Sequence, residues 1–87
     1  MKRVCFFASL RELVGNSQIH VSAKTWSDLD EQLQQCLSDE AYQAIKAENV
    51  RVALDQVLCE QAFEHMIHQD ELISAEEIAF LPPVTGG

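Results

Sequence analysis

The residues best suited to chemistry stand together at the end of the sequence, in the stretch LPPVTGG. Pro82 and Pro83 favour an extended polyproline conformation, which holds the residues after them away from a folded body. Gly86 and Gly87 carry no Cβ, so they can pass through spaces that other residues cannot enter. A free α-carboxyl group has a pKa of about 3.3–3.7, so a terminal Gly87 is ionised at neutral pH.

A carboxylate on such a narrow stem can enter the active site of another protein. There it can attack the α-phosphate of ATP and become an acyl adenylate, which is activated for transfer. The alternative is a frayed chain end that happens to contain glycines. Because the segment directly follows a predicted strand, we interpret it as a functional tail, residues 82–87, attached to one domain, residues 1–81.

The rest of the sequence offers no convincing catalytic or metal site. His65 and His68 have the i, i+3 spacing that lets two histidines on a helix reach one ion, but no third ligand stands at a suitable spacing. Ser9, Arg11 and His20 do not form a recognisable catalytic triad. We therefore expect no bound metal or cofactor, and a chain that does not catalyse a reaction by itself.

Composition and net charge limit the kinds of partner that this chain can bind. The 87 residues carry a net charge of −8, and their balance of 47% apolar and 23% charged residues is typical of one small globular domain. The six basic residues form no run, which argues against nucleic-acid binding. An acidic surface favours basic protein partners and repels small phosphorylated substrates, so a pocket for an anion should belong to another chain.

The apolar run near the start of the sequence is short. It follows Lys2 and Arg3 and leads directly into Arg11 and Glu12, so it predicts neither a signal peptide nor a membrane span. We expect a cytoplasmic protein without a membrane partner.

Three cysteines, Cys5, Cys36 and Cys59, are the remaining reactive side chains. Their number is odd, and no pair has the spacing of a metal-ligand or C-x-x-C motif. All three lie among apolar residues, so we expect reduced, buried thiols that pack as small hydrophobic side chains.

Two strands should position the tail. Residues 3–10 read as a central strand in which Val4, Phe6 and Ala8 face one way, while Phe7 faces the other. Residues 11–17 predict at most a short turn of helix, and a second strand at 17–23 should form a hairpin with the first.

The last strand covers residues 76–81 and places Ile78 and Phe80 on one face and Leu81 on the other. If it neighbours the first strand, Phe7 and Leu81 share a face beside the tail. One long helix can cover only the opposite face, so we predict an exposed patch that binds partners. The alternative is that the two residues belong to a second, minor core.

The helices and a second hairpin complete the prediction. Residues 25–37 form the clearest helix, which Thr25 or Ser27 can cap. A shorter helix over 38–46, a hairpin that turns at Asp55-Gln56, and an extra short helix within 60–73 follow. A mixed sheet covered by one long helix is an α+β fold. The long helix carries one apolar stripe, formed by Trp26, Leu29, Leu33, Cys36 and Leu37.

The stretches FFASLRELVG and IAFLPPVTGG resemble the small subunits of molybdopterin synthase, which are ubiquitin-like sulfur carriers. The resemblance implies a β-grasp fold whose first and last strands are adjacent and parallel at the sheet centre. It implies that an adenylyltransferase related to ubiquitin-activating enzymes uses ATP to adenylate Gly87, which then becomes a thiocarboxylate. The tail next enters the large synthase subunit, where sulfur transfer to cyclic pyranopterin monophosphate gives molybdopterin. The assembly implied is a heterotetramer.

The same resemblance assigns roles to individual residues. Gly87 carries the sulfur and Gly86 provides clearance. Phe7 and Leu81 match apolar positions that pack on partners, and Arg11 matches a polar contact beside them, although Leu81 replaces a more common aromatic residue. The threading segment consists of Pro82, Pro83, Val84 and Thr85.

Three other functions use or share these features. A sulfur carrier for thiamine synthesis or tRNA thiolation would use the same Gly-Gly chemistry. A protein modifier would join Gly87 to lysines through isopeptide bonds and would give high-mass conjugates. A pure interaction module would leave the terminal mass unchanged.

Overall fold

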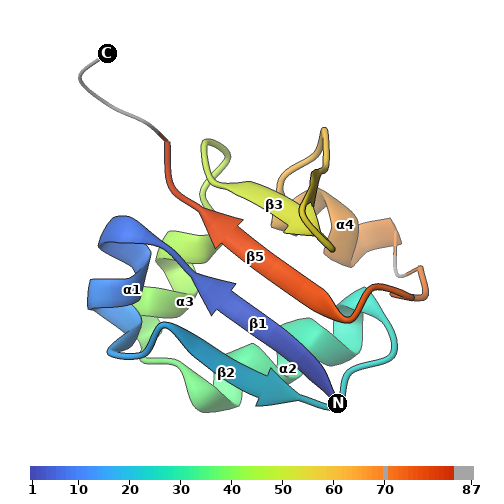
Figure 1. The fold of residues 1–87 in the computed structure, drawn as a ribbon, viewed down its shortest axis with the longest axis horizontal. Helices are drawn as coiled ribbons and strands as arrows, with labels where there is room; N and C mark the ends of the chain where they lie inside the picture. The colour runs from blue at the N-terminus through green and yellow to red at the C-terminus, as the bar shows by residue number, and fades with distance from the viewer. Residues whose placement is uncertain (70, 84–87) are drawn as a thin grey trace.

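A computed structural model describes residues 1–69 and 71–83 of the chain (Figure 1). The described residues form five strands, β1 (Lys2–Phe6), β2 (Gln18–Val21), β3 (Arg51–Leu54), β4 (Val57–Leu58) and β5 (Glu77–Leu81). They also form four helices, α1 (Ala8–Val14), α2 (Trp26–Cys36), α3 (Asp39–Ile45) and α4 (Phe63–Gln69). In the described part of the chain, no helix is long and apolar enough to cross a membrane.

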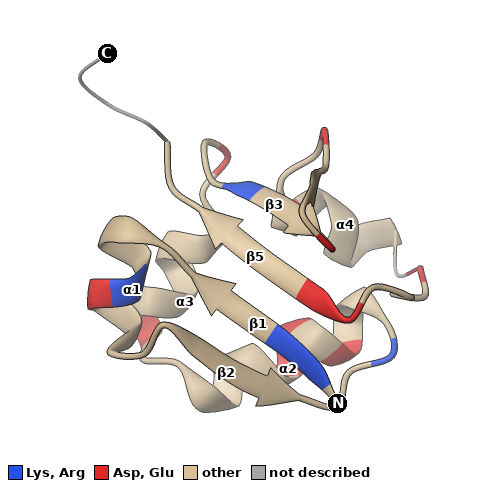
Figure 2. Ribbon diagram, viewed as in Figure 1, with Lys and Arg blue, Asp and Glu red and all other residues tan. Residues whose placement is uncertain are grey.

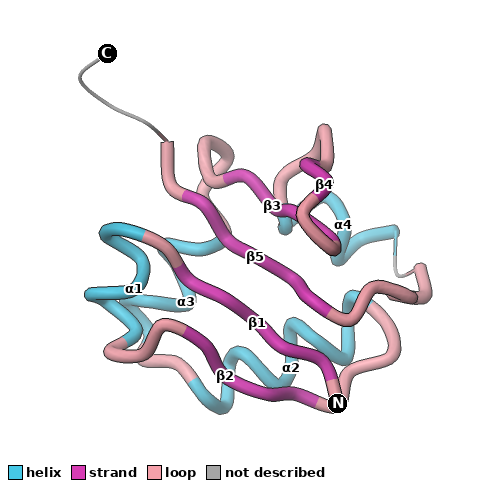
Figure 3. Tube along the Cα trace, viewed as in Figure 1, coloured by secondary structure: helices cyan, strands magenta, loops and turns pink. Residues whose placement is uncertain are grey.

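The strands form one mixed sheet in the order β2-β1-β5-β3-β4. The two central strands, β1 and β5, run parallel, and the other neighbours are antiparallel. The helices α2, α3 and α4 lie behind the sheet in the view of Figures 1 and 3, so among the described residues they cover one face of the sheet and leave the other uncovered. This confirms the predicted α+β architecture and the central, parallel pairing of the first and last strands.

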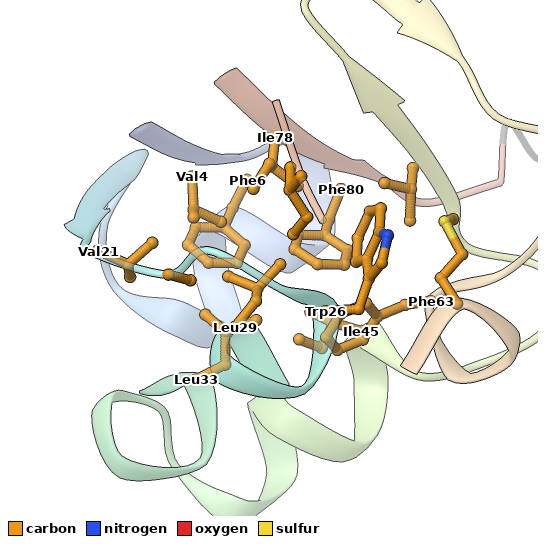
Figure 4. Packing of buried hydrophobic residues seen from close by; sticks show 14 of the residues in the cluster. Val4, Phe6, Val21, Trp26, Leu29, Leu33, Ile45, Phe63, Ile78 and Phe80 are labelled. Carbon is orange, nitrogen blue, oxygen red and sulfur yellow. The ribbon is translucent and has the colours of Figure 1, made fainter. Parts of the chain in front are cut away.

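The core lies between the sheet and the helices, and its centre is aromatic (Figure 4). The ring of Phe80 stacks on Phe6, with centroids 5.9 Å apart, and meets the edge of Phe63 at 5.2 Å. Trp26 packs on Phe63 at 6.1 Å. Fully buried aliphatic side chains surround these rings: Val4, Val21, Leu29, Leu33, Ile45, Val52 and Ile78. The strand that precedes the tail is therefore held by the core through Phe80.

Side-chain caps start the two helices that follow β2, as the sequence predicts. The Thr25 hydroxyl accepts a hydrogen bond from the Asp28 amide at 3.2 Å and begins α2. The Ser38 hydroxyl accepts one from the Ala41 amide at 3.2 Å and begins α3. A third helix, α4, confirms the short helix predicted within residues 60–73.

The hairpin of β3 and β4 turns at Asp55-Gln56, as predicted. Both residues have positive φ, 48° and 71°, which is the conformation of a two-residue type I′ turn. The Asp55 carboxylate also accepts hydrogen bonds from the amides of Glu76 and Glu77, at 3.1 and 2.9 Å. This carboxylate therefore ties the hairpin to the start of β5.

The prediction for residues 3–17 was partly wrong. The strand β1 ends at Phe6 rather than continuing to residue 10, and the seven-residue helix α1 replaces the short turn. Ala8, with φ of 50°, turns the chain into α1, where it is exposed while Leu10 is buried. The β1 and β2 strands do pair antiparallel, but α1 connects them in place of a tight turn.

The prediction of three buried cysteines was also wrong. Cys36 is exposed, and Cys5 and Cys59 are only half-buried. Cys36 is the last residue of α2 and is not among its buried residues, and Cys5 faces the uncovered side of the sheet. All three are free thiols, and partial burial raises the pKa of the Cys59 thiol.

Candidate functional site

The root of the tail is the C-terminal end of β5. This strand pairs with β1 as far as Phe80 and with β3 as far as Leu81, and Pro82 and Pro83 then leave the sheet. A proline has no N–H to donate, so the ladder ends where the prolines begin. The other predicted tail residues lie outside the described residues: Val84, Thr85, Gly86 and Gly87.

Strand register defines the composition of the uncovered sheet face. Cys5, Ala79, Ala53 and Leu58 stand opposite one another across β1, β5, β3 and β4, so their side chains share one face. The helices pack against the opposite face. The two alanines are shielded by their neighbours, but Leu58 is 58% exposed. We call the uncovered side, made by these four residues with Leu81 and Phe7, the open face.

Phe7 and Leu81 extend this apolar row to the root of the tail. The Phe7 amide donates a hydrogen bond to the Phe80 carbonyl oxygen at 3.4 Å, so Phe7 lies beside the end of β5. Phe7 is 46% exposed and Leu81 is half-buried, whereas Phe6 and Phe80 are buried. The prediction that these two residues face away from the helices is confirmed.

The segment that could have covered this patch lies on the other side. Phe63 and Met66 of α4 are buried in the main core, and α4 packs against α2. Leu72 forms a bridge with Thr25 at the start of α2. In the described part of the chain, nothing therefore folds Phe7 into a second core.

Two basic residues flank the root of the tail. Arg11 lies one helical turn after Phe7, and its amide approaches the Phe7 carbonyl oxygen at 3.4 Å. Arg51, the first residue of β3, stands directly opposite Leu81. Both side chains are exposed. The structure thus places Phe7 and Arg51 beside the end of β5, with Arg11 one helical turn from Phe7, and the binding roles of these residues stay predictions.

The sequence did not identify Leu58 and Arg51 as site residues, because their position on the open face depends on the order of the strands in the sheet. The alternation of β3 and β4 was visible in the sequence. Nothing in the sequence alone showed that β3 would pair with β5, so the two residues could not be assigned to the same face as Leu81.

The other candidate sites do not assemble. In residues 1–69 and 71–83, no group of three His, Cys, Asp or Glu side chains is placed to hold a metal ion, so His65 and His68 form no such site. Two hollows beside α4, of about 370 and 330 Å³, are lined by Glu48, Glu60 and Glu71 but by no Lys or Arg. These hollows do not suit an anionic ligand.

The comparison with known proteins identifies the family. The family model described as the ThiS family matches residues 4–87. The chain belongs to the ThiS family. It is also 37% identical over 90 residues to the molybdopterin synthase sulfur carrier subunit of Escherichia coli K12, a match that covers 100% of both chains. The resemblance noted in the sequence is thereby confirmed.

Solved structures share the fold of this ThiS-family chain. The solution structure of small archaeal modifier protein 1 from Methanosarcina acetivorans has a TM-score of 0.66 at 23% identity, and the match covers 98% of this chain and 94% of that one. The crystal structure of SAMP1 from Haloferax volcanii has a TM-score of 0.57 at 20% identity, covering 99% and 98%. These likenesses confirm the ubiquitin-like β-grasp fold.

Proposed function

We propose that this chain is a sulfur carrier for molybdopterin synthesis and that Gly87 is the carrier group. One observation above all supports the proposal: the 37% identity to a molybdopterin synthase sulfur carrier subunit extends over 100% of both chains. The family match also runs to residue 87, so it includes the Gly-Gly end. The rigid root of the tail, between β1 and β3, would present that end at a fixed edge of the sheet.

The chemistry proceeds in three steps on Gly87. The carboxylate oxygen attacks the α-phosphate of ATP on an adenylyltransferase, and pyrophosphate leaves. Sulfide, supplied by a sulfur donor, then attacks the acyl carbon and displaces AMP, and the product is a thiocarboxylate on Gly87. In the large synthase subunit, the sulfur is transferred to cyclic pyranopterin monophosphate, and water returns Gly87 to a carboxylate. The chain consumes no cofactor itself, because ATP is used by the activating partner.

The negative charge of the chain indicates that the anionic substrates bind to its partners. The net charge of −8 and the glutamate-lined hollows beside α4 disfavour a phosphorylated substrate on this chain. The pterin and ATP would therefore bind to partners. The partners that we propose are the large synthase subunit, in a heterotetramer, and an adenylyltransferase related to ubiquitin-activating enzymes, all in the cytoplasm.

Intact mass spectrometry of the chain purified from its own cells tests the proposal. We expect a species whose mass corresponds to one terminal oxygen replaced by sulfur, and the same species should be absent when Gly87 is deleted. Lysine conjugates without the sulfur-containing form would instead indicate a protein modifier. If the sulfur-containing form appears but yields no molybdopterin with the large synthase subunit, the chain serves another sulfur pathway.

A further inference from the structure

The open face carries an arginine at each end, and the two arginines differ in whether a carboxylate of this chain pairs with them. At the end where β5 begins, the Arg3 guanidinium lies 2.5 Å from the Glu77 carboxylate, and this pair is internally neutralised. At the end where β5 leaves the sheet, Arg51 stands opposite Leu81. Within residues 1–69 and 71–83, the Arg51 guanidinium has no hydrogen bond or ion pair. Figure 2 shows these basic segments at the starts of β1 and β3.

Two of the other basic residues, Lys2 and Lys46, also have partners within the chain. The Lys2 ammonium donates a hydrogen bond to the Ala75 carbonyl oxygen at 2.7 Å. The Lys46 ammonium lies 4.9 Å from the centre of the Tyr42 ring and 3.9 Å from the Glu64 carboxylate. Only three of the six basic side chains therefore lack a partner among the described residues, and two of them, Arg11 and Arg51, flank the root of the tail.

We propose that Arg51 determines partner specificity by pairing with a carboxylate on the protein that receives the tail. This inference rests on the proposed function, in which that protein is the large synthase subunit. The planar guanidinium suits a bidentate contact with a carboxylate. The occupant of the open face is thus a protein surface with an apolar centre and a carboxylate that lies opposite Arg51.

The location of Arg51 also determines the orientation in which the partner docks on the open face. Because Glu77 neutralises Arg3, only the tail end of the open face attracts a carboxylate. A partner that docked in the reverse direction would leave this carboxylate beside Asp55, Glu76 and Glu77. Over the rest of its surface, the net charge of −8 favours basic groups on the partner, so a carboxylate of the partner is attracted where Arg51 and Arg11 lie.

The test compares two variants with the same change in charge. Arg51→Glu alters the root of the tail, whereas Lys24→Glu alters an exposed residue whose carbonyl oxygen bonds Ile73, near the other end of β5. We expect Arg51→Glu to weaken binding to the large synthase subunit about tenfold at low salt, mainly by slower association. Lys24→Glu should stay within about twofold, and high salt should reduce the effect at Arg51.

Surface plasmon resonance at two salt concentrations gives the rates, and thermal unfolding confirms that both variants are folded. Equal weakening by both variants would mean that net charge alone matters, and the proposal would be wrong. Wild-type affinity for Arg51→Glu would also overturn it while leaving the proposed function in place. If the wild-type chain does not bind the large subunit at all, the proposed function fails, and this inference fails with it.

Discussion

Phe6 and Phe7 are adjacent in the sequence and have opposite surroundings. Phe6 stacks on Phe80 in the core and is 1% exposed, whereas Phe7 is 46% exposed beside Leu81. Strand alternation separates the two rings, and the positive φ of Ala8 ends β1 before Phe7 could be drawn into a longer ladder. The pair therefore offers a matched test of whether Phe7 serves binding or folding.

We expect Phe7→Ala to weaken binding to the large synthase subunit by about 1–3 kcal/mol, the range for an interface anchor. Its cost in stability should be smaller than the roughly 3–5 kcal/mol expected for Phe6→Ala, which empties a core site. Titration calorimetry and urea unfolding measure the two effects. A core-sized loss of stability for Phe7→Ala, with unchanged affinity, would place the docking surface elsewhere.

Tyr42 gives the stability of the chain a dependence on alkaline pH. Its hydroxyl donates to the Asp30 carboxylate at 2.5 Å and accepts from the Gln34 amide at 3.0 Å. Desolvation by burial, followed by this bond to Asp30, raises the pKa of Tyr42 above its ordinary value of 10.0. The folded state thus holds the proton more tightly than the unfolded state, and this contribution is complete below the ordinary pKa.

The free energy of unfolding should therefore fall as the pH rises through the raised pKa of Tyr42. Tyr42→Phe removes the titrating group, so this variant should be less stable near neutral pH and lose less stability above pH 10 or so. Urea unfolding of both proteins across this pH range measures the difference. Parallel pH profiles would show that Tyr42 does not contribute to the dependence.

At the level of elements, the hairpin turn shows how one side chain can link two parts of a sheet. Asp55 adopts the left-handed conformation that the turn needs and accepts two amide hydrogen bonds from the start of β5. Asp55→Ala loses both bonds and leaves at positive φ an alanine, which tolerates the left-handed conformation less well than aspartate does. We expect a loss of about 1–3 kcal/mol in urea unfolding.

Asp55→Asn is the matched control for this change. Asparagine tolerates the left-handed conformation and retains a side-chain oxygen that can accept the amides of Glu76 and Glu77. Its stability should stay within about 1 kcal/mol of the wild-type value. If alanine and asparagine cost the same, the turn is not held by this carboxylate oxygen.

The elements themselves differed in how readily they could be predicted. Helix α2 was clear because Thr25 caps it and an apolar stripe runs along it. The start of α1 was hidden, since Phe7, Ala8 and Leu10 continue the alternation of β1 and only the backbone at Ala8 breaks it. Periodicity does not report a single residue at positive φ, and the predicted strand therefore ran four residues too far.

For the whole molecule, the arrangement of the sheet explains why so much of the site could be predicted. The apolar character of the first strand indicated a central strand, and the resemblance to the sulfur carriers implied that the last strand lies beside it, which the observed strand order confirms. Strand order beyond β5 was not encoded in any local pattern. Arg51 and Leu58 therefore became site residues only once β3 was seen to pair with β5.

The same arrangement predicts that the tail is needed for sulfur transfer but not for the stability of the fold. Among the described residues, the buried cluster extends from Val4 to Phe80 and includes neither Pro82 nor Pro83. Deleting residues 85–87 should abolish sulfur transfer and leave the urea midpoint nearly unchanged, because one threonine and two glycines have little apolar surface to bury. A variant that replaces Gly87 with Ala keeps the length of the tail and serves as the control for folding. Reconstitution with the adenylyltransferase and the large subunit measures transfer, and a large loss of stability on deletion would show that the tail also supports the fold.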